Sequence, residues 1–344
     1  MPSASAAIAE THELGSLGVL HLKRFWSRRI ASLTGPRIEA EDATDWVADN
    51  TLLSGLRLGL RETYTFLFAN RPTFEEFEAW VLEKNGGVLD PVRLQRLNAA
   101  LEGNGSASTG CVAEITTEPV LTPQDLAFWN ENGYVVVHDA VPPEQCEAAA
   151  QAIYAFLGMD PAQPDTWYNG PQGHSIWIPL YHHPAFWANR ESPRIHRAFA
   201  QLWGRDDLWV SVDQGGMNPP ERPGWQFPGP HLHFDVSLAL PIPFGVQGIL
   251  YLTDTAANQG AFTCVPGFHR RIEAWLNSLP SGADPRAENL RALGAVPIAG
   301  RAGDLIVWHH ALPHGASPNR STKPRVVQYI RMSPSQWGHN PKWR

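Results

Sequence analysis

Beyond about residue 118, the chain becomes a series of short apolar runs interrupted by glycine and proline, and this pattern limits what it can fold into. The runs are too short for buried helices and have the length of strands. They cover residues 208–212, 246–252, 261–265, 304–308 and 325–330. Thirty prolines and fourteen tryptophans also favour many loops and a fold rich in pockets. We therefore expect an α+β protein with a mainly β core, a β-sandwich or jelly roll, with helices packed on one side.

The first part of the chain has helical patterns instead. Residues 53–68 carry apolar side chains at three- and four-residue spacing, and residues 73–84 and 91–101 predict two further helices. Thr73 and Glu76 have the spacing of a capping box. The Gly- and Ser-rich residues 103–110 have the composition of a linker.

We therefore predict two domains: an N-terminal helical region at residues 1–118 and a jelly-roll domain at residues 119–344. The second is expected to begin with a helix from Thr122 to Gly133, a strand at 134–138 and a helix at 143–157.

Charge and cysteine content narrow the class of protein. A net charge of −7, without long basic runs, gives no reason to expect nucleic acid or an anionic membrane as partner. The three cysteines show no C-x-x-C spacing, which disfavours a thiolate zinc site and a disulfide framework. No signal peptide or membrane-spanning stretch is visible, so a cytoplasmic protein is expected.

One short motif has the spacing of a metal site. His233 and Asp235 are separated by one residue, and in an extended strand residues i and i+2 point to the same face. With a histidine from a distant strand, they could form the two-histidine, one-carboxylate site of non-haem iron oxygenases. Taken alone the motif is weak, since about one such pair is expected by chance. For the motif alone, a strand histidine beside a solvated aspartate is the better explanation.

A second segment makes the interpretation more specific. Residues 303–319 read as a Gly-Asp turn, an apolar strand, a histidine cluster and a Gly-containing turn, and a strand with Arg325 follows. This segment resembles the phytanoyl-CoA dioxygenase family of iron(II)- and 2-oxoglutarate-dependent oxygenases. In that family a His-Gly step supplies a metal ligand, and an arginine eleven positions later binds 2-oxoglutarate. His314-Gly315 and Arg325 match this spacing.

Two other stretches agree with the resemblance, which covers about residues 119–334. Residues 252–269 resemble the family's strand, turn and Val-Pro-Gly-Ser-His passage, with Phe268 in place of the usual Ser, and residues 132–138 resemble its first core strand. The resemblance implies a double-stranded β-helix (a cupin-like jelly roll) with flanking helices. It also implies iron(II) as cofactor, with 2-oxoglutarate and O2 as co-substrates.

By this resemblance His233, Asp235 and His314 are the metal ligands, and Arg325 grips the far carboxylate of 2-oxoglutarate. His309, His310 and His231 are rivals for the histidine positions, and packing is the simpler role for the first two. We expect Gly315 to permit a backbone torsion that a side chain would hinder.

Further residues are assigned to the site on weaker grounds. Gln214 could contact 2-oxoglutarate, although a structural role explains it equally well. Trp308, Phe227 and Trp177 are candidates for the substrate pocket, although a tryptophan in an apolar strand is usually part of the core.

The implied activity is oxidation, most simply hydroxylation, of an unactivated C–H bond of a small organic molecule, as in secondary metabolism. The carboxylate at Asp235 predicts oxygenation rather than halogenation, because related halogenases have a small residue there. Residues 1–118 could form a lid, a homodimer surface or a docking site for a carrier protein, or simply add packing.

Two alternatives stay open: a cupin-type isomerase or lyase that does not use 2-oxoglutarate, and a non-catalytic binding module on the same fold. Arg325 argues against the first, and the intact ligand set argues against the second.

Overall fold

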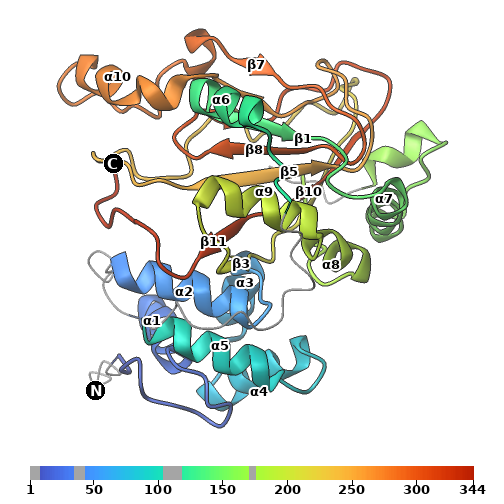
Figure 1. Cartoon of the computed structure of the whole chain (residues 1–344). Coiled ribbons are helices and arrows are strands. Elements are labelled where there is room, and N and C mark those ends of the chain that lie inside the picture. The colour runs from blue at the N-terminus through green and yellow to red at the C-terminus, as the bar shows by residue number, and fades with distance from the viewer. Residues whose placement is uncertain (1–7, 35–42, 104–117, 170–175) are drawn as a thin grey trace. The chain divides into compact units, whose positions relative to one another are not determined.

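The computed structural model describes residues 8–34, 43–103, 118–169 and 176–344, which divide into two compact units (Figure 1). A helical unit comprises Met1–Glu114, Arg205–Val212 and Met332–Lys342. A mixed unit with most of the strands comprises Ile115–Gly204, Asp213–Arg331 and Trp343–Arg344. Two segments that come after the predicted boundary at residue 118, Arg205–Val212 and Met332–Lys342, thus belong to the helical unit and not to the second domain. Most of the predicted linker, residues 104–110, lies outside the described residues.

In the residues described, the helical unit has five helices and a two-stranded antiparallel sheet. These elements are α1 (Leu22–Thr34), α2 (Ala43–Gly55), α3 (Leu60–Asn70), α4 (Phe74–Lys84), α5 (Pro91–Leu101), β3 (Leu208–Val210) and β11 (Met332–Pro334). The capping box predicted at the start of α4 is present, since Thr73 Oγ1 accepts from Glu76 N and the Glu76 carboxylate accepts from Thr73 N. The single helix predicted at 53–68 is wrong: α2 ends at Gly55, Arg57 has a positive φ of 55°, and α3 begins at Leu60.

A buried ion cluster joins α1 and α2 inside this unit. The fully buried carboxylate of Asp49 lies 2.8 Å from His21 Nε2, 3.1 Å from Arg28 Nη1 and 2.6 Å from Arg29 Nη2. Each cation on α1 was desolvated on folding, and the carboxylate compensates for part of that cost. Asp45 of α2 adds ion pairs with Arg24 at 2.8 Å and Arg28 at 3.5 Å.

Replacing Asp49 by alanine is expected to lower the free energy of unfolding of the helical unit by about 3–5 kcal/mol, because it removes a fully buried carboxylate that compensates for the desolvation of buried cations. Urea denaturation followed by far-UV circular dichroism measures the change. Glu13→Ala is the matched control, since Glu13 forms an exposed pair with Lys23 at 3.1 Å and such pairs contribute about 0–1 kcal/mol. Equal effects of the two substitutions would contradict a structural role for the cluster.

The mixed unit contains two antiparallel sheets. The larger has the strand order β1-β8-β5-β10-β4-β2, and the smaller has the order β7-β6-β9. Their strands are β1 (Tyr134–Val137), β2 (Trp177–Ile178), β4 (Gly215–Asn218), β5 (Val246–Tyr251), β6 (Thr263–Cys264), β7 (Val296–Pro297), β8 (Leu305–His309), β9 (His314–Gly315) and β10 (Arg325–Tyr329). Helices and antiparallel sheets are thus combined as predicted, and every strand pairing is antiparallel.

Helices cover one face of the larger sheet. The helices of this unit are α6 (Pro123–Asn132), α7 (Pro143–Leu157), α8 (Pro184–Arg190), α9 (Pro193–Trp203) and α10 (Ile272–Ser278), with short 3-10 turns at Pro164–Tyr168, Phe268–Arg270 and Leu290–Leu293. A Cβ added at Gly215 would meet Ile153 of α7 and Phe186 of α8, and one at Gly248 would meet Phe199 of α9. The absence of side chains at these glycines lets the helices lie close to the sheet.

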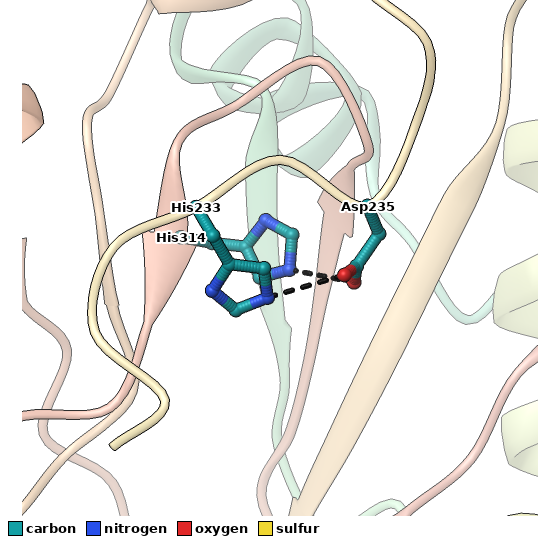
Figure 2. Close-up of side chains that lie close together, drawn as sticks. All are labelled: His233, Asp235 and His314. Atoms are coloured by element: carbon teal, nitrogen blue, oxygen red, sulfur yellow. Dashed lines mark hydrogen bonds and ion pairs between the residues drawn. The ribbon is translucent and has the colours of Figure 1, made fainter. Parts of the chain in front are cut away.

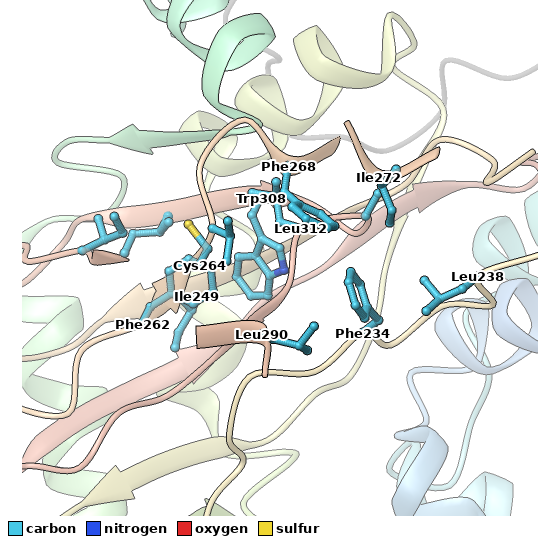
Figure 3. Packing of buried hydrophobic residues seen from close by; sticks show 14 of the residues in the cluster. Phe234, Leu238, Ile249, Phe262, Cys264, Phe268, Ile272, Leu290, Trp308 and Leu312 are labelled. Atoms are coloured by element: carbon cyan, nitrogen blue, oxygen red, sulfur yellow. The ribbon is translucent and has the colours of Figure 1, made fainter. Parts of the chain in front are cut away.

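The opposite face of the larger sheet packs against the smaller sheet and the loops around it. Ile249, Trp308 and Val327 point to this side and join Phe262 and Cys264 in one buried cluster (Figure 3). Alternation along a strand places every second residue on this side. On β10, Arg325, Val327 and Tyr329 therefore face the space between the sheets, while Val326 and Gln328 face the helices.

No helix in the described part of the chain combines the length and the apolar character that crossing a membrane requires.

Candidate metal centre

His233, Asp235 and His314 lie together at one end of the space between the sheets (Figure 2). His314 belongs to β9, whereas His233 and Asp235 lie in an irregular segment between β4 and β5. The prediction that this segment is an extended strand is wrong, because only a single bridge pairs it with β9. That bridge has two hydrogen bonds, His233 N to His314 O at 2.9 Å and His314 N to His233 O at 3.1 Å.

Gly315 allows this bridge to form. A Cβ added at Gly315 would lie 2.5 Å from the backbone oxygen of His231, which is closer than real Cβ contacts. The residue does not have a positive φ. The expectation that it permits an unusual torsion is therefore wrong, and its role is to let the segment of His233 approach β9.

The three side chains form a compact donor set. One ligand atom from each residue lies within 4.8 Å of the others, and His233 Nε2 and His314 Nε2 each lie 3.2 Å from an oxygen of Asp235. Desolvation lowers the pKa of His233, but the hydrogen bond and charge of Asp235 outweigh it, so the pKa ends above its usual value. Desolvation likewise raises the pKa of Asp235, but the two histidines hold it far below its usual range.

The tautomers of both histidines suit a metal ion. His233 Nδ1 is 2.6 Å from the oxygen of His231, and His314 Nδ1 is 2.9 Å from the oxygen of Leu312. A carbonyl oxygen only accepts, so Nδ1 carries the proton and Nε2 of the neutral ring has a free lone pair. Lone pairs that converge like this repel one another unless the rings are protonated or a cation lies among them. The donor set fits a divalent metal held by two histidines and one carboxylate.

Two residues that the sequence did not point to hold Asp235 in place. Gln247 Nε2 donates to Asp235 Oδ2 at 2.7 Å. Arg286 donates through Nη1 to the backbone oxygen of Phe234 at 2.6 Å and through Nη2 to that of Val236. Neither belongs to a sequence motif near the ligands. Only the fold brings them to Asp235.

Arg325 lies on the face of β10 that points between the sheets, and it is fully buried. Its Nε and Nη2 atoms have no hydrogen-bond partner within the described ranges. A buried guanidinium with free N–H groups is costly unless an anion accepts from them. Arg325 therefore fits a carboxylate ligand that the chain itself does not provide.

The other predicted site residues lie at varying distances from the centre. Trp308 is buried with its ring 5.0 Å from that of His314, and Phe227 is clustered with Ala316 and Ile176. Trp177 is paired with Gly216 on the outer strand β2.

Gln214 does not lie on a strand but directly before β4, where its side chain accepts from the hydroxyl of Tyr181. Its backbone oxygen accepts from Tyr329 N, at the other end of β10 from Arg325.

The rival histidines occupy other surroundings. His309 Nδ1 accepts from Ala311 N at 3.0 Å, and His310 Nε2 lies beside the oxygen of Pro243. Burial lowers the pKa of His309 to about 3 and that of His310 to about 4. Both rings are therefore neutral at pH 7. The ring of His231 contacts Phe227 at 5.3 Å, and its backbone oxygen supports His233.

These two buried neutral histidines are expected to make the protein sensitive to acid. In the unfolded chain they take up protons near pH 6.5, whereas in the folded protein they do so only near pH 3 and pH 4. The unfolded state thus binds more protons between these values, and stability falls as pH falls below about 6.5, by up to about 1.4 kcal/mol per pH unit for each ring.

His309→Asn, which keeps an acceptor for Ala311 N, should reduce this slope in urea denaturation at pH 7, 6 and 5. His183→Asn is the matched control, because His183 also accepts from the amide two residues on but is exposed. An unchanged slope in His309→Asn would contradict the burial of a neutral ring.

Comparison with known proteins places the chain in a family. Residues 129–327, more than half of the chain, match the family model "Phytanoyl-CoA dioxygenase (PhyH)". A protein of Dictyostelium discoideum named as a candidate phytanoyl-CoA dioxygenase is 22% identical over 260 residues, which cover 60% of this chain and 74% of that protein. The Ava biosynthesis cluster protein O of Aspergillus versicolor is 22% identical over 267 residues, covering 67% and 86%.

Among solved structures, the non-heme alpha-ketoglutarate-dependent epimerase SnoN from nogalamycin biosynthesis aligns with a TM-score of 0.46 and 16% identity, covering 63% of this chain and 85% of its own. HygX from Streptomyces hygroscopicus, crystallised with nickel and 2-oxoglutarate, aligns with a TM-score of 0.45 and 16% identity, covering 63% and 88%. On the match to the family model, the chain belongs to the phytanoyl-CoA dioxygenase family of iron- and 2-oxoglutarate-dependent enzymes.

Proposed function

We propose that this protein is an iron(II)- and 2-oxoglutarate-dependent oxygenase that hydroxylates an unactivated C–H bond of a small organic molecule. His233, Asp235 and His314 hold the metal in this proposal, inside a double-stranded β-helix formed by the two sheets of the mixed unit. The main support is the donor set: two imidazoles whose Nδ1–H groups are engaged, with a carboxylate, all within 4.8 Å. Three ligands on one side of an ion leave positions open for a co-substrate.

Arg325 supports 2-oxoglutarate as that co-substrate. Its guanidinium is fully buried, and two of its nitrogen atoms lack partners in the part of the chain described. Arginine matches a carboxylate with two parallel hydrogen bonds. In our proposal it binds the far carboxylate of 2-oxoglutarate, and the 2-oxo acid end reaches the metal.

Bound iron and 2-oxoglutarate would supply the oxidant: the oxo acid and dioxygen yield succinate and carbon dioxide, and one oxygen atom is inserted into the C–H bond. The chain's own share is to hold the ligands, orient the co-substrate and exclude water. Phe227, Ala316 and Ile176 form a small apolar cluster, and Ala316 lies two positions after His314 in the chain. In our proposal this cluster forms an apolar wall of the substrate site. It suits a substrate with substantial hydrocarbon surface.

The alternatives explain less of the site. A cupin-type isomerase or lyase would use the three ligands but would leave the buried charge of Arg325 without a partner. A binding module has no need for two histidines held in the tautomer that suits a metal. Docking of a second copy or a carrier protein to the N-terminal region, a Gln214 contact to 2-oxoglutarate and the cytoplasmic location stay predictions.

Anaerobic addition of iron(II) and then 2-oxoglutarate should produce the visible charge-transfer band of the chelate. In Arg325→Ala, 2-oxoglutarate affinity should fall at least about tenfold, because hydrogen bonds to charged groups contribute about 1.5–3 kcal/mol each. Arg320→Ala is the matched control, since the Arg320 side chain is exposed, near the start of the same strand. Unchanged affinity in Arg325→Ala would refute the clamp. A metal-bound wild type without a band would favour the cupin-type enzyme.

Metal binding should also stabilise the fold. At a cobalt(II) concentration of 100 times the dissociation constant, wild-type protein should gain about 2.7 kcal/mol, seen as a rise in melting temperature. Asp235→Ala should lose most of this rise, whereas Asp165→Ala, whose carboxylate is fully exposed, should keep it. If wild-type protein shows no rise and binds no metal, the binding-module alternative gains.

A further inference from the structure

We propose that Gln247 is a positioning residue for the metal centre: its amide holds Oδ2 of Asp235 and thereby leaves Oδ1 free to ligate the ion. The inference rests on the proposed function, in which Asp235 binds a metal. It assigns a role to a residue of β5 that lies outside every sequence motif considered above.

The contact is direct and its donor is well placed. Gln247 Nε2 lies 2.7 Å from Asp235 Oδ2. Gln247 lies near the start of β5, where its backbone is paired with Trp308 of β8. On β5 its side chain points to the same face as Ile249 and Tyr251, both of which belong to the cluster between the sheets. A rigid strand therefore presents the amide to the carboxylate.

Gln247 differs in kind from the other partners of Asp235. His233 and His314 contact the carboxylate through Nε2, the atoms that would turn to the metal. The amide NH2 group only donates, so it cannot ligate a cation and remains available to the carboxylate. If the two histidines turn to a bound metal, Gln247 still donates its hydrogen bond to Asp235 Oδ2. A hydrogen bond to one oxygen favours coordination through the other.

The backbone of Asp235 is fixed by a different residue. Arg286 binds the backbone oxygens of Phe234 and Val236, on either side of Asp235. The path of the chain therefore does not depend on Gln247. Loss of the amide would free the side-chain torsions of Asp235 while its backbone stays in place.

The orientation of the amide carries a cost that supports a functional role. A carboxylate only accepts, so the NH2 end must face Asp235 and the oxygen must point away. Gln247 Oε1 is then buried without a partner among the residues described. An unpaired buried acceptor is unfavourable, because it has lost its hydrogen bonds to water without replacement. The amide thus favours the hydrogen bond to Asp235 at the expense of its own oxygen.

Cobalt(II) titration of the apo-protein tests the proposal, with visible absorption and calorimetry as readouts. Gln247→Met has a similar length but no donor, and its cobalt(II) dissociation constant should rise about 10- to 100-fold, as for other residues that orient metal ligands. Its visible spectrum should change too, because a carboxylate that is free to bind through both oxygens alters the coordination number. The melting temperature of the apo-protein should stay the same or rise, since the unpaired Oε1 is removed.

Gln124→Met, on the exposed surface of α6, is the matched control and should leave affinity and spectrum unchanged. Gln247→Asn, one methylene shorter, provides the same test should Gln247→Met fail to fold. Wild-type protein that binds no cobalt(II) would overturn the proposed function and this inference with it. Wild-type binding, with the same affinity and spectrum in the Gln247 variants, would overturn this inference alone. Weaker binding that only follows a lower apo melting temperature would also overturn it, because a structural role predicts that result.

Discussion

The candidate metal centre depends on the pair of backbone hydrogen bonds between His233 and His314. His314 is 79 positions from Asp235, and the irregular segment with His233 and Asp235 has no ladder of its own. The bridge ties this segment to β9, and the lack of a side chain at Gly315 lets the two approach. Because the backbone atoms are joined there, the two imidazoles are held on the same side without a regular strand.

Around this bridge, the side chains of the three candidate ligands have hydrogen-bond partners, whereas Arg325 has unpaired nitrogen atoms where a ligand is expected. Each imidazole is oriented by a carbonyl oxygen, and Asp235 is held through both its side chain and the flanking backbone. Arg325, by contrast, has unpaired nitrogen atoms although it is fully buried. Because a buried charge without a partner is costly, such a group marks the place of an absent anion. The unpaired oxygen of Gln247 has another cause, because its amide must turn the NH2 group towards Asp235.

Local signals predicted the helices α4 to α7 and the strands β1, β3, β5, β6, β8 and β10. Thr73, Thr122 and Gly133 mark the ends of helices as expected, because capping depends on residues three or four positions apart. The longer apolar runs became β5, β8 and β10. The break between α2 and α3 was missed because the apolar spacing continues through it. Strand β4 was missed because its two glycines have low strand propensity and are kept there by close packing against Val327 and Ile153.

By itself, the sequence determined the chemistry that is available: His233, Asp235, His314 and Arg325, at spacings that resemble one enzyme family. Periodicity and capping also determined where α4 to α7 and the longer strands form, since both act over a few residues. Only the tertiary structure decided that the segment of Asp235 is irregular, that Nε and Nη2 of buried Arg325 lack partners among the described residues, and that Gln247 and Arg286 hold Asp235 and its flanking backbone. These features arise from contacts between residues far apart in the chain, and no local pattern encodes which side chains will meet there.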